Sequence, residues 1–330
     1  MAEATLPLAR RAHDGLRHTV VILAYHRVMP LPDPERYPFD LGLISAQPDE
    51  FSWQMELLRA KFNPIPLAQV VDYLRGRADI PPRAVVVTFD DGFVDNYEYA
   101  FPILRRLGVP ATIFLSTAYL ESRKPFWFEM ATYFMQRAPV GAVAIPGTER
   151  SLPFGSENAA RRKSAALLLR YLKSLPHQDV VDFLDDMERN MRPVINRDEF
   201  QLSAQLDWQQ VRTMHAAGVE FGSHTVRHAL LAHLGGDDLW RELYDSRLEI
   251  ERRLQSQVVS LAYPVGRTYA YSTAVMAAAG KAGYRVACSY NPGCNWMGAL
   301  DPFELRRQGV EHWTTRQRFR ATLELPGWID

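Results

Sequence analysis

Short apolar runs without polar alternation recur along this chain, and each lies next to a segment with helical spacing. Residues 84–89 and 111–115 are two such runs, and the helical segment between them ends at Gly108. Continuous apolar runs of this length are typical of strands that are buried on both faces, as in parallel sheets. Gly108 stands where a left-handed C-terminal cap of a helix is expected. Pro102 predicts that the helix begins or bends there.

The same unit returns later in the chain. Helical segments from about Ser203, Asp238 and Ser272 precede apolar runs at 219–222, 258–262 and 284–289, and a first strand is expected at 19–25. Repeated strand–helix units with short links predict a parallel sheet that is either open or closed into a barrel. Functional residues on such folds gather where the strands end.

Residues 121–202 interrupt this repeat. They contain an aromatic cluster, a stretch rich in glycine and proline, and a charged helical region at about 159–184. We expect one domain spanning 1–330, in which 121–202 form a mainly helical insertion. The insertion is either a structural cap or a wall of a substrate groove.

Charge and cysteine content exclude several classes of protein. The 38 basic residues balance the 38 acidic ones, so nothing indicates binding to nucleic acid or to an anionic membrane. Residues 1–18 lack the apolar core of a secretory signal, and no apolar stretch is long enough to span a bilayer. Cys288 and Cys294 imply no disulfide framework. We therefore expect a cytoplasmic protein without a transmembrane segment; its oligomeric state is left open.

Two adjacent carboxylates, Asp90 and Asp91, follow the predicted strand 84–89 and precede Gly92. Neighbouring carboxylates disfavour joint ionisation unless a cation lies between them or nearby. One of the pair could bind a metal ion while the other serves as a general base. The alternative is that both acids cap the following helix.

Two histidines, His224 and His228, follow the predicted strand 219–222. At this spacing we expect both on one face of a helical turn, where they could chelate a divalent metal. A chance spacing among nine histidines is the alternative. A turn at Tyr263, Pro264, Val265 and Gly266 follows a third strand and either presents a backbone N–H to an oxyanion or is an ordinary turn.

These segments together resemble the NodB-homology polysaccharide deacetylases, also called family-four carbohydrate esterases. Thr88-Phe89-Asp90-Asp91-Gly92 is similar to the first motif of that family, His224-Thr225-Val226-Arg227-His228 to the second, and Leu261–Gly266 to a divergent third. The resemblance covers roughly residues 19–120 and 203–311. It implies a deformed parallel (β/α) barrel.

The resemblance also implies roles for individual residues. Asp90 corresponds to the general base, and Asp91, His224 and His228 correspond to the ligands of one divalent metal ion. Zinc is the usual ion in the family, and cobalt, nickel or iron also suits nitrogen and oxygen ligands. Tyr263, Pro264 and Val265 correspond to the segment that holds the oxyanion or the substrate.

The sequence departs from the family pattern at two points. Ala262 stands where many members have an arginine that positions the base, and Arg307 is a candidate substitute from a neighbouring strand. The sequence also has no clear leucine–histidine motif near the C-terminus to supply the general acid, although His312 lies in that region. Ala24-Tyr25-His26 is similar to the Tyr-His segment of the branch that includes poly-N-acetylglucosamine deacetylases, so His26 is favoured over His312 as the acid.

The sequence thus predicts a metal-dependent hydrolase that removes N-acyl groups, most simply N-acetyl, from a polysaccharide, an oligosaccharide or a glycan precursor. One alternative is an O-acyl or formamido deacylase that acts on a lipid-linked sugar. Another is a catalytically impaired carbohydrate-binding protein on the same fold.

Overall fold

Strand β1 (Thr19–Tyr25) begins the sheet, and all seven of its residues are buried. Val21 and Leu23 pack in a large cluster with the surrounding helices, whereas Val20 and Ile22 belong to a smaller cluster on the other face of the sheet. The computed structural model describes residues 18–122, 124–145 and 148–325. The prediction about a signal segment therefore falls almost entirely outside the described residues.

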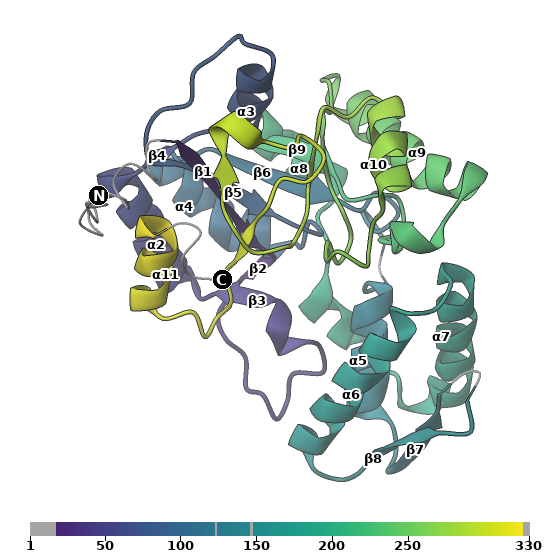
Figure 1. The fold of residues 1–330 in the computed structure, drawn as a ribbon. Coiled ribbons are helices and arrows are strands. Elements are labelled where there is room, and N and C mark those ends of the chain that lie inside the picture. The colour runs from purple at the N-terminus through teal and green to yellow at the C-terminus, as the bar shows by residue number, and fades with distance from the viewer. Residues whose placement is uncertain (1–17, 123, 146–147, 326–330) are drawn as a thin grey trace, which may run out of the picture.

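Six parallel strands form the body of the sheet (Figure 1). Their order is β11-β10-β9-β6-β5-β1, and the strands are β5 (Ala84–Phe89), β6 (Ala111–Leu115), β9 (Glu220–Ser223), β10 (Ser260–Ala262) and β11 (Val286–Cys288) beside β1. Short β4 (Asn63–Pro64) pairs with β5, and β12 (Asn295–Trp296) pairs with β1 in antiparallel fashion. The parallel sheet predicted from the apolar runs is confirmed.

The segment 305–309 joins the two ends of this sheet. Leu305 pairs with Cys288 of β11, and β13 (Gln308–Gly309) pairs in parallel with Leu23 and Ala24 of β1. The sheet therefore curls into a deformed barrel, as the resemblance implied. Arg307 lies on this closing segment, between the two pairings.

Helices cover the outside of the barrel. They are α2 (Pro48–Lys61), α3 (Leu67–Leu74), α4 (Phe101–Leu107), α8 (Trp208–Ala216), α9 (Gly236–Leu254), α10 (Thr273–Lys281) and α11 (Arg316–Glu324). Gly108 caps α4 with a φ of 62°, as predicted. Pro102 lies in the first turn of α4, after a π-helical turn (Asn96–Ala100). None of the helices in the described ranges is long and apolar enough to cross a membrane.

One predicted helix begins later than expected. Residues Arg197–Ser203 form a separate 3₁₀ helix, and α8 starts only at Trp208. The Asp207 carboxylate accepts a hydrogen bond from the backbone N–H of Gln210. The side-chain oxygen of Gln210 in turn accepts one from the backbone N–H of Asp207. This capping box stabilises a helix that starts at Trp208, five positions after Ser203.

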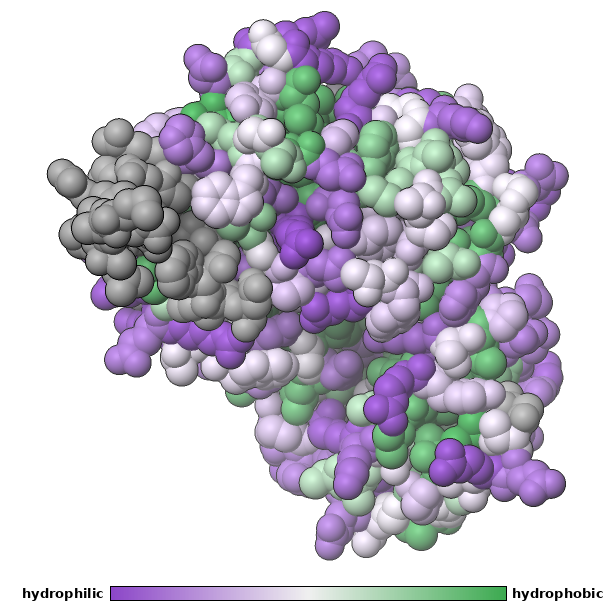
Figure 2. All heavy atoms as spheres, in the orientation of Figure 1, coloured by the Kyte–Doolittle hydropathy of each residue, from purple (hydrophilic) through white to green (hydrophobic). Residues whose placement is uncertain are grey.

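The segment between β6 and β9 folds around its own hydrophobic cluster. It contains α5 (Trp127–Arg137), α6 (Asn158–Leu172) and α7 (His177–Met191), and also an antiparallel hairpin of β7 (Gly141–Ala144) and β8 (Ser151–Phe154) that the sequence did not predict. Tyr37 and Phe39 join this cluster from the proline-rich loop (residues 29–43), which follows β2 (Arg27–Val28). In Figures 1 and 2 the insertion forms a lobe against one end of the barrel.

Gly222 of β9 offers a test of barrel packing. A Cβ at this position would lie 2.5 Å from a ring carbon of Phe114 and 2.6 Å from Ser260 Oγ. We expect Gly222→Ala to lower the free energy of unfolding by about 1–3 kcal/mol, because the barrel has no room for the methyl group. Gly155→Ala is the control, since a Cβ there meets nothing within 4 Å. Urea unfolding measures both, and an unchanged midpoint for Gly222→Ala would contradict this packing.

Candidate metal centre and active site

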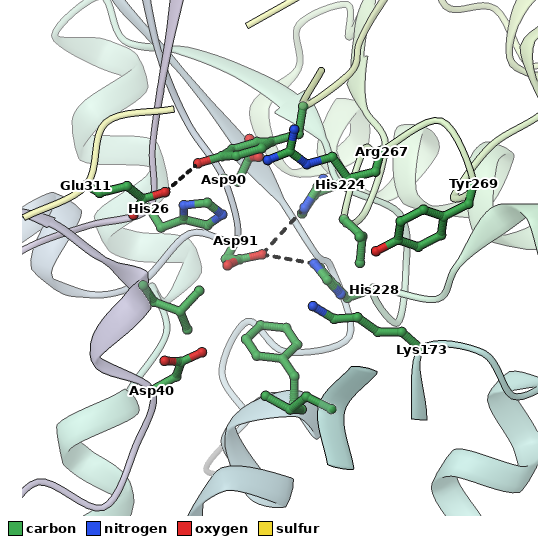
Figure 3. Close-up of a pocket in the computed structure, with 15 residues that line it drawn as sticks. His26, Asp40, Asp90, Asp91, Lys173, His224, His228, Arg267, Tyr269 and Glu311 are labelled. Atoms are coloured by element: carbon green, nitrogen blue, oxygen red, sulfur yellow. Dashed lines mark hydrogen bonds and ion pairs between the residues drawn. The ribbon is translucent and has the colours of Figure 1, made fainter. Parts of the chain in front are cut away.

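Residues that follow the parallel strands converge on one pocket of about 260 Å³. The strand ends contribute His26 after β1, Asp90 and Asp91 after β5, His224 after β9, Val265 after β10 and Tyr290 after β11. Phe128, Leu169 and Lys173 of the insertion and Asp40 and Leu43 of the proline-rich loop line the opposite wall. Figure 3 shows these residues around a common space.

Asp91, His224 and His228 form a buried cluster within this pocket. Asp91 Oδ1 lies 3.5 Å from His224 Nε2 and 3.3 Å from His228 Nε2, and the three potential ligand atoms lie within 4.8 Å of one another. Asp91 Oδ1 has no hydrogen-bond partner among the described residues. A buried carboxylate oxygen without a partner is costly, and a cation bound between these three atoms would remove that cost.

The protonation of the cluster also suits a metal ion. His224 Nδ1 lies 2.8 Å from the carbonyl oxygen of Ala262, so this nitrogen carries the proton and Nε2 presents a lone pair. Burial lowers the pKa of both histidines, that of His228 to about 3, and so keeps their rings neutral. Burial raises the pKa of Asp91. Two imidazole nitrogens and one carboxylate oxygen fit zinc or another first-row divalent ion.

The loop that carries the histidines is not the helical turn that their spacing predicted. After β9 the chain runs irregularly, and Thr225 and His228 have φ values of 69° and 54°. Glu242, buried on α9, accepts from the backbone N–H groups of Val226 and Arg227, each at 2.9 Å. The two rings still meet, with centroids 4.8 Å apart, because Glu242 holds a tight loop instead of a helix.

Backbone strain is concentrated in the same place. Asp91 and Val265 also have positive φ values, of 74° and 63°. Such values are rare for residues other than glycine, and for a β-branched residue such as Val265 they are true outliers. Strained backbone that the surrounding structure enforces is typical of functional sites.

Asp90 is held by Arg307 from the barrel interior. Its two carboxylate oxygens accept from Arg307 Nη1 and Nη2, both at 2.7 Å, and Arg307 Nε donates to the carbonyl of Ser289. Burial by itself would raise the pKa of Asp90, but the charge of Arg307 and its hydrogen bonds to the carboxylate lower that pKa below its ordinary value. Asp90 is therefore an ionised carboxylate with a fixed orientation.

Two of the three residues predicted to contact the oxyanion or the substrate, Tyr263 and Pro264, lie behind the pocket. Tyr263 is buried, stacks on Tyr271 and donates its hydroxyl to the carbonyl of Phe303. Pro264 is also buried and, like Tyr263 and Arg307, is not part of the pocket lining. Of the predicted turn, Val265 alone reaches the pocket.

The structure separates the two candidates for the general acid. His26 lines the pocket, and its Nδ1 is buried without a hydrogen-bond partner among the described residues. His312 contacts the carbonyl of Ile44 and packs on Trp313, outside the pocket lining. Burial lowers the pKa of His26 below its ordinary value, and the charges of Asp91 and Asp90 offset only part of this shift.

Several pocket residues were not found from the sequence. Asp40, Lys173, Arg267, Tyr269, Tyr290 and Glu311 line the pocket, and Glu242 supports it from outside. None belongs to a motif, since each reaches the site through the fold of a loop or of the insertion. For Lys173 alone there was a signal, the aromatic and charged character of 121–202, which left open that the insertion forms a wall of the substrate groove.

A barrel with a two-histidine, one-carboxylate cluster and a second, arginine-bound carboxylate at its strand ends is suited to metal-assisted hydrolysis. A sequence profile of the polysaccharide deacetylases matches residues 77–287, which is more than half of the chain. The chain therefore belongs to the polysaccharide deacetylase family. His26 and Arg307 both lie outside the matched range.

Relatives and solved structures agree with this assignment. The poly-beta-1,6-N-acetyl-D-glucosamine N-deacetylase of Escherichia coli strain K12 is 39% identical over 99 residues, covering 30% of this chain and 13% of that protein. YxkH of Bacillus subtilis strain 168 is 23% identical over 211 residues, covering 64% of this chain and 46% of that protein. The chain thus spans less than half the length of either relative.

Two solved structures share the fold. The deacetylase PplD of Streptococcus pyogenes, in complex with acetate, superposes with a TM-score of 0.61 at 18% identity over 92% of this chain and 98% of that one. IcaB from Ammonifex degensii gives 0.57 at 19% identity over 93% of this chain and 96% of that one.

Glu311 provides a test of pocket electrostatics. Burial raises its pKa from 4.5 to about 7, although a hydrogen bond from Tyr290 lowers it. The folded state therefore favours the protonated acid. Below pH 4.5 Glu311 makes its whole contribution to the free energy of unfolding, and this contribution is lost as the pH rises through about 7. We expect Glu311→Gln, which does not titrate, to gain stability relative to the parent protein across this range.

Urea unfolding at pH values on both sides of this range measures the difference. Exposed Glu324→Gln controls for the loss of one carboxylate. A pH-independent difference between Glu311→Gln and the parent protein would rule out the raised pKa.

Proposed function

We propose that this protein is a metal-dependent deacylase that removes N-acyl groups, in particular N-acetyl, from an amino-sugar glycan. The observation that supports it most is Asp91 Oδ1, which has no hydrogen-bond partner within the described ranges and faces two imidazole nitrogens beside the fixed carboxylate of Asp90. The similarity to an N-deacetylase of poly-N-acetylglucosamine supports an N-acetyl substrate. In this proposal Asp91, His224 and His228 hold the ion, with zinc as the first candidate.

A divalent ion bound there would polarise the amide carbonyl and make water a stronger nucleophile. Asp90 has the role of general base and takes the proton of the attacking water. Its orientation is set by the two hydrogen bonds from Arg307, which leave each oxygen a second lone pair. Arg307 thereby acts through Asp90 as a positioning residue. It takes the place of the arginine that many family members have at the position of Ala262.

His26 has the role of general acid, which donates a proton to the leaving nitrogen. It follows the end of β1, beside Asp90 and Asp91, which follow the neighbouring strand β5. The centroid of its ring lies 5.5 Å from that of Tyr290. One reason for the alternative of a catalytically impaired carbohydrate-binding protein was Ala262, which leaves the base without its usual arginine. The hydrogen bonds from Arg307 to Asp90 remove that reason. Val265, held in its strained turn, would present its backbone N–H to the oxyanion.

Removal of the base is the first test. Asp90→Asn should lower kcat for deacetylation of an N-acetylglucosamine oligomer by about 10²–10⁴-fold, because an amide cannot accept the proton of water. Bound metal, measured by elemental analysis, should stay near one equivalent, since Asp90 is outside the ligand cluster. Asp237→Asn, an exposed residue of α9, is the control. Full activity of Asp90→Asn would overturn the assignment of the base.

The proton donor is tested by a pair of histidine variants. His26→Gln should reduce kcat by about 10²-fold or more and remove the alkaline limb of the pH–rate profile, because the leaving amine loses its acid. His312→Gln is the matched control outside the pocket. Release of acetate measures both. If His312→Gln is the impaired variant, the acid assignment is wrong.

A further inference from the structure

A second cavity, of about 340 Å³, continues from the metal pocket along the insertion. The two cavities share Asp40, Leu169, Lys173 and Tyr269, so they form one groove between α6 and the proline-rich loop. A pocket for one sugar ring therefore opens directly into space for a neighbouring group. The barrel supplies the chemical residues, and the insertion supplies this second space.

The second cavity is positively charged. Arg162, Arg170 and Lys173 line it, against one acidic residue, Asp40. The guanidinium of Arg162 donates to the carbonyl oxygens of Pro34, Tyr37 and Phe39, which fix the loop but do not neutralise the charge. Arg170 is exposed at the surface of α6. A negatively charged ligand is therefore favoured here.

Lys173 stands where the two cavities meet. It caps the C-terminus of α6, and in Figure 3 its side chain extends from the insertion towards His228 and Asp91. No hydrogen bond or ion pair joins its ammonium group to any residue in the described part of the chain, whereas Lys124 nearby in the same insertion pairs with Glu188. Burial lowers the pKa of Lys173, although Asp40 and Asp91 raise it. A poorly solvated ammonium group gains from an anionic partner.

Tyr269 adds an apolar surface at the same junction. It lines both cavities and is 57% exposed. An aromatic face beside a few polar groups is typical of pockets that bind small organic ligands. Its position lets a sugar ring lie against it while a charged substituent reaches Lys173.

We propose that this groove is a subsite for an oxyanion, a carboxylate or a phosphate, carried by the substrate next to the N-acyl sugar, with Lys173 as its main contact. The inference rests on the proposed function and narrows its substrate to an acidic glycan or a sugar phosphate. Lys173 thus selects among substrates and takes no part in cleaving the amide.

The test compares three probes on metal-loaded protein: a neutral tetramer of N-acetylglucosamine, a hyaluronan tetramer in which glucuronate alternates with N-acetylglucosamine, and N-acetylglucosamine phosphate. We expect the protein to favour one or both charged probes. Lys173→Met should lower kcat/KM for the favoured probe about tenfold, mainly through KM, because one charge-assisted hydrogen bond is lost. A preference for hyaluronan assigns the carboxylate, and one for the sugar phosphate assigns the phosphate.

Two further variants control for charge and for helix stability. Lys173→Arg keeps the cation and should keep the preference, whereas Lys163→Met removes an exposed lysine of the same helix and should change nothing. The subsite is overturned if the neutral tetramer is used as well as both charged probes, or if Lys173→Met lowers kcat for all three equally.

Isothermal titration calorimetry with the same probes separates this inference from the proposed function. If acetate is released from no probe, the proposed function fails. Tighter binding of a charged probe that is lost in Lys173→Met then still supports the subsite, and equal binding of all three probes rejects it.

Discussion

The pair of hydrogen bonds between Arg307 and Asp90 links the closure of the barrel to its chemistry. Arg307 lies on the segment that joins β11 to β1, and Asp90 follows β5 on the far side of β1. Both side chains are buried, so either one alone would leave an uncompensated charge in the barrel. Correct closure therefore stabilises the ion pair, and the ion pair orients the carboxylate that lines the pocket.

The metal-ligand cluster depends on a second buried carboxylate. Glu242 on α9 holds Val226 and Arg227 by their backbone N–H groups, and this fixes a loop with two left-handed residues, Thr225 and His228. A regular helix at this point would make such support unnecessary. The position of His228 therefore requires a strained backbone, and the charge-assisted hydrogen bonds to Glu242 on the neighbouring helix offset that strain.

The sequence predicted what depends on local pattern. The bounds of β1, β5 and β6 follow from apolar runs, and Asp91, His224 and His228 meet because strand ends meet. The prediction of a helical turn from His224 to His228 was wrong, since the spacing of two histidines does not specify the backbone between them. Glu242, Lys173 and Glu311 were missed because each contacts the site through tertiary packing, with no motif around it. Arg307 was found as a candidate, but its partner geometry required the closed barrel.

The position of Arg307 near the end of the barrel has a consequence for how the molecule is made. Asp90, Asp91, His224 and His228 all leave the ribosome before Arg307 does. Until Arg307 is synthesised, the nascent chain lacks both the cation that orients Asp90 and the segment that closes the barrel. The order of synthesis therefore places the residue that orients Asp90 late, together with the closure of the barrel.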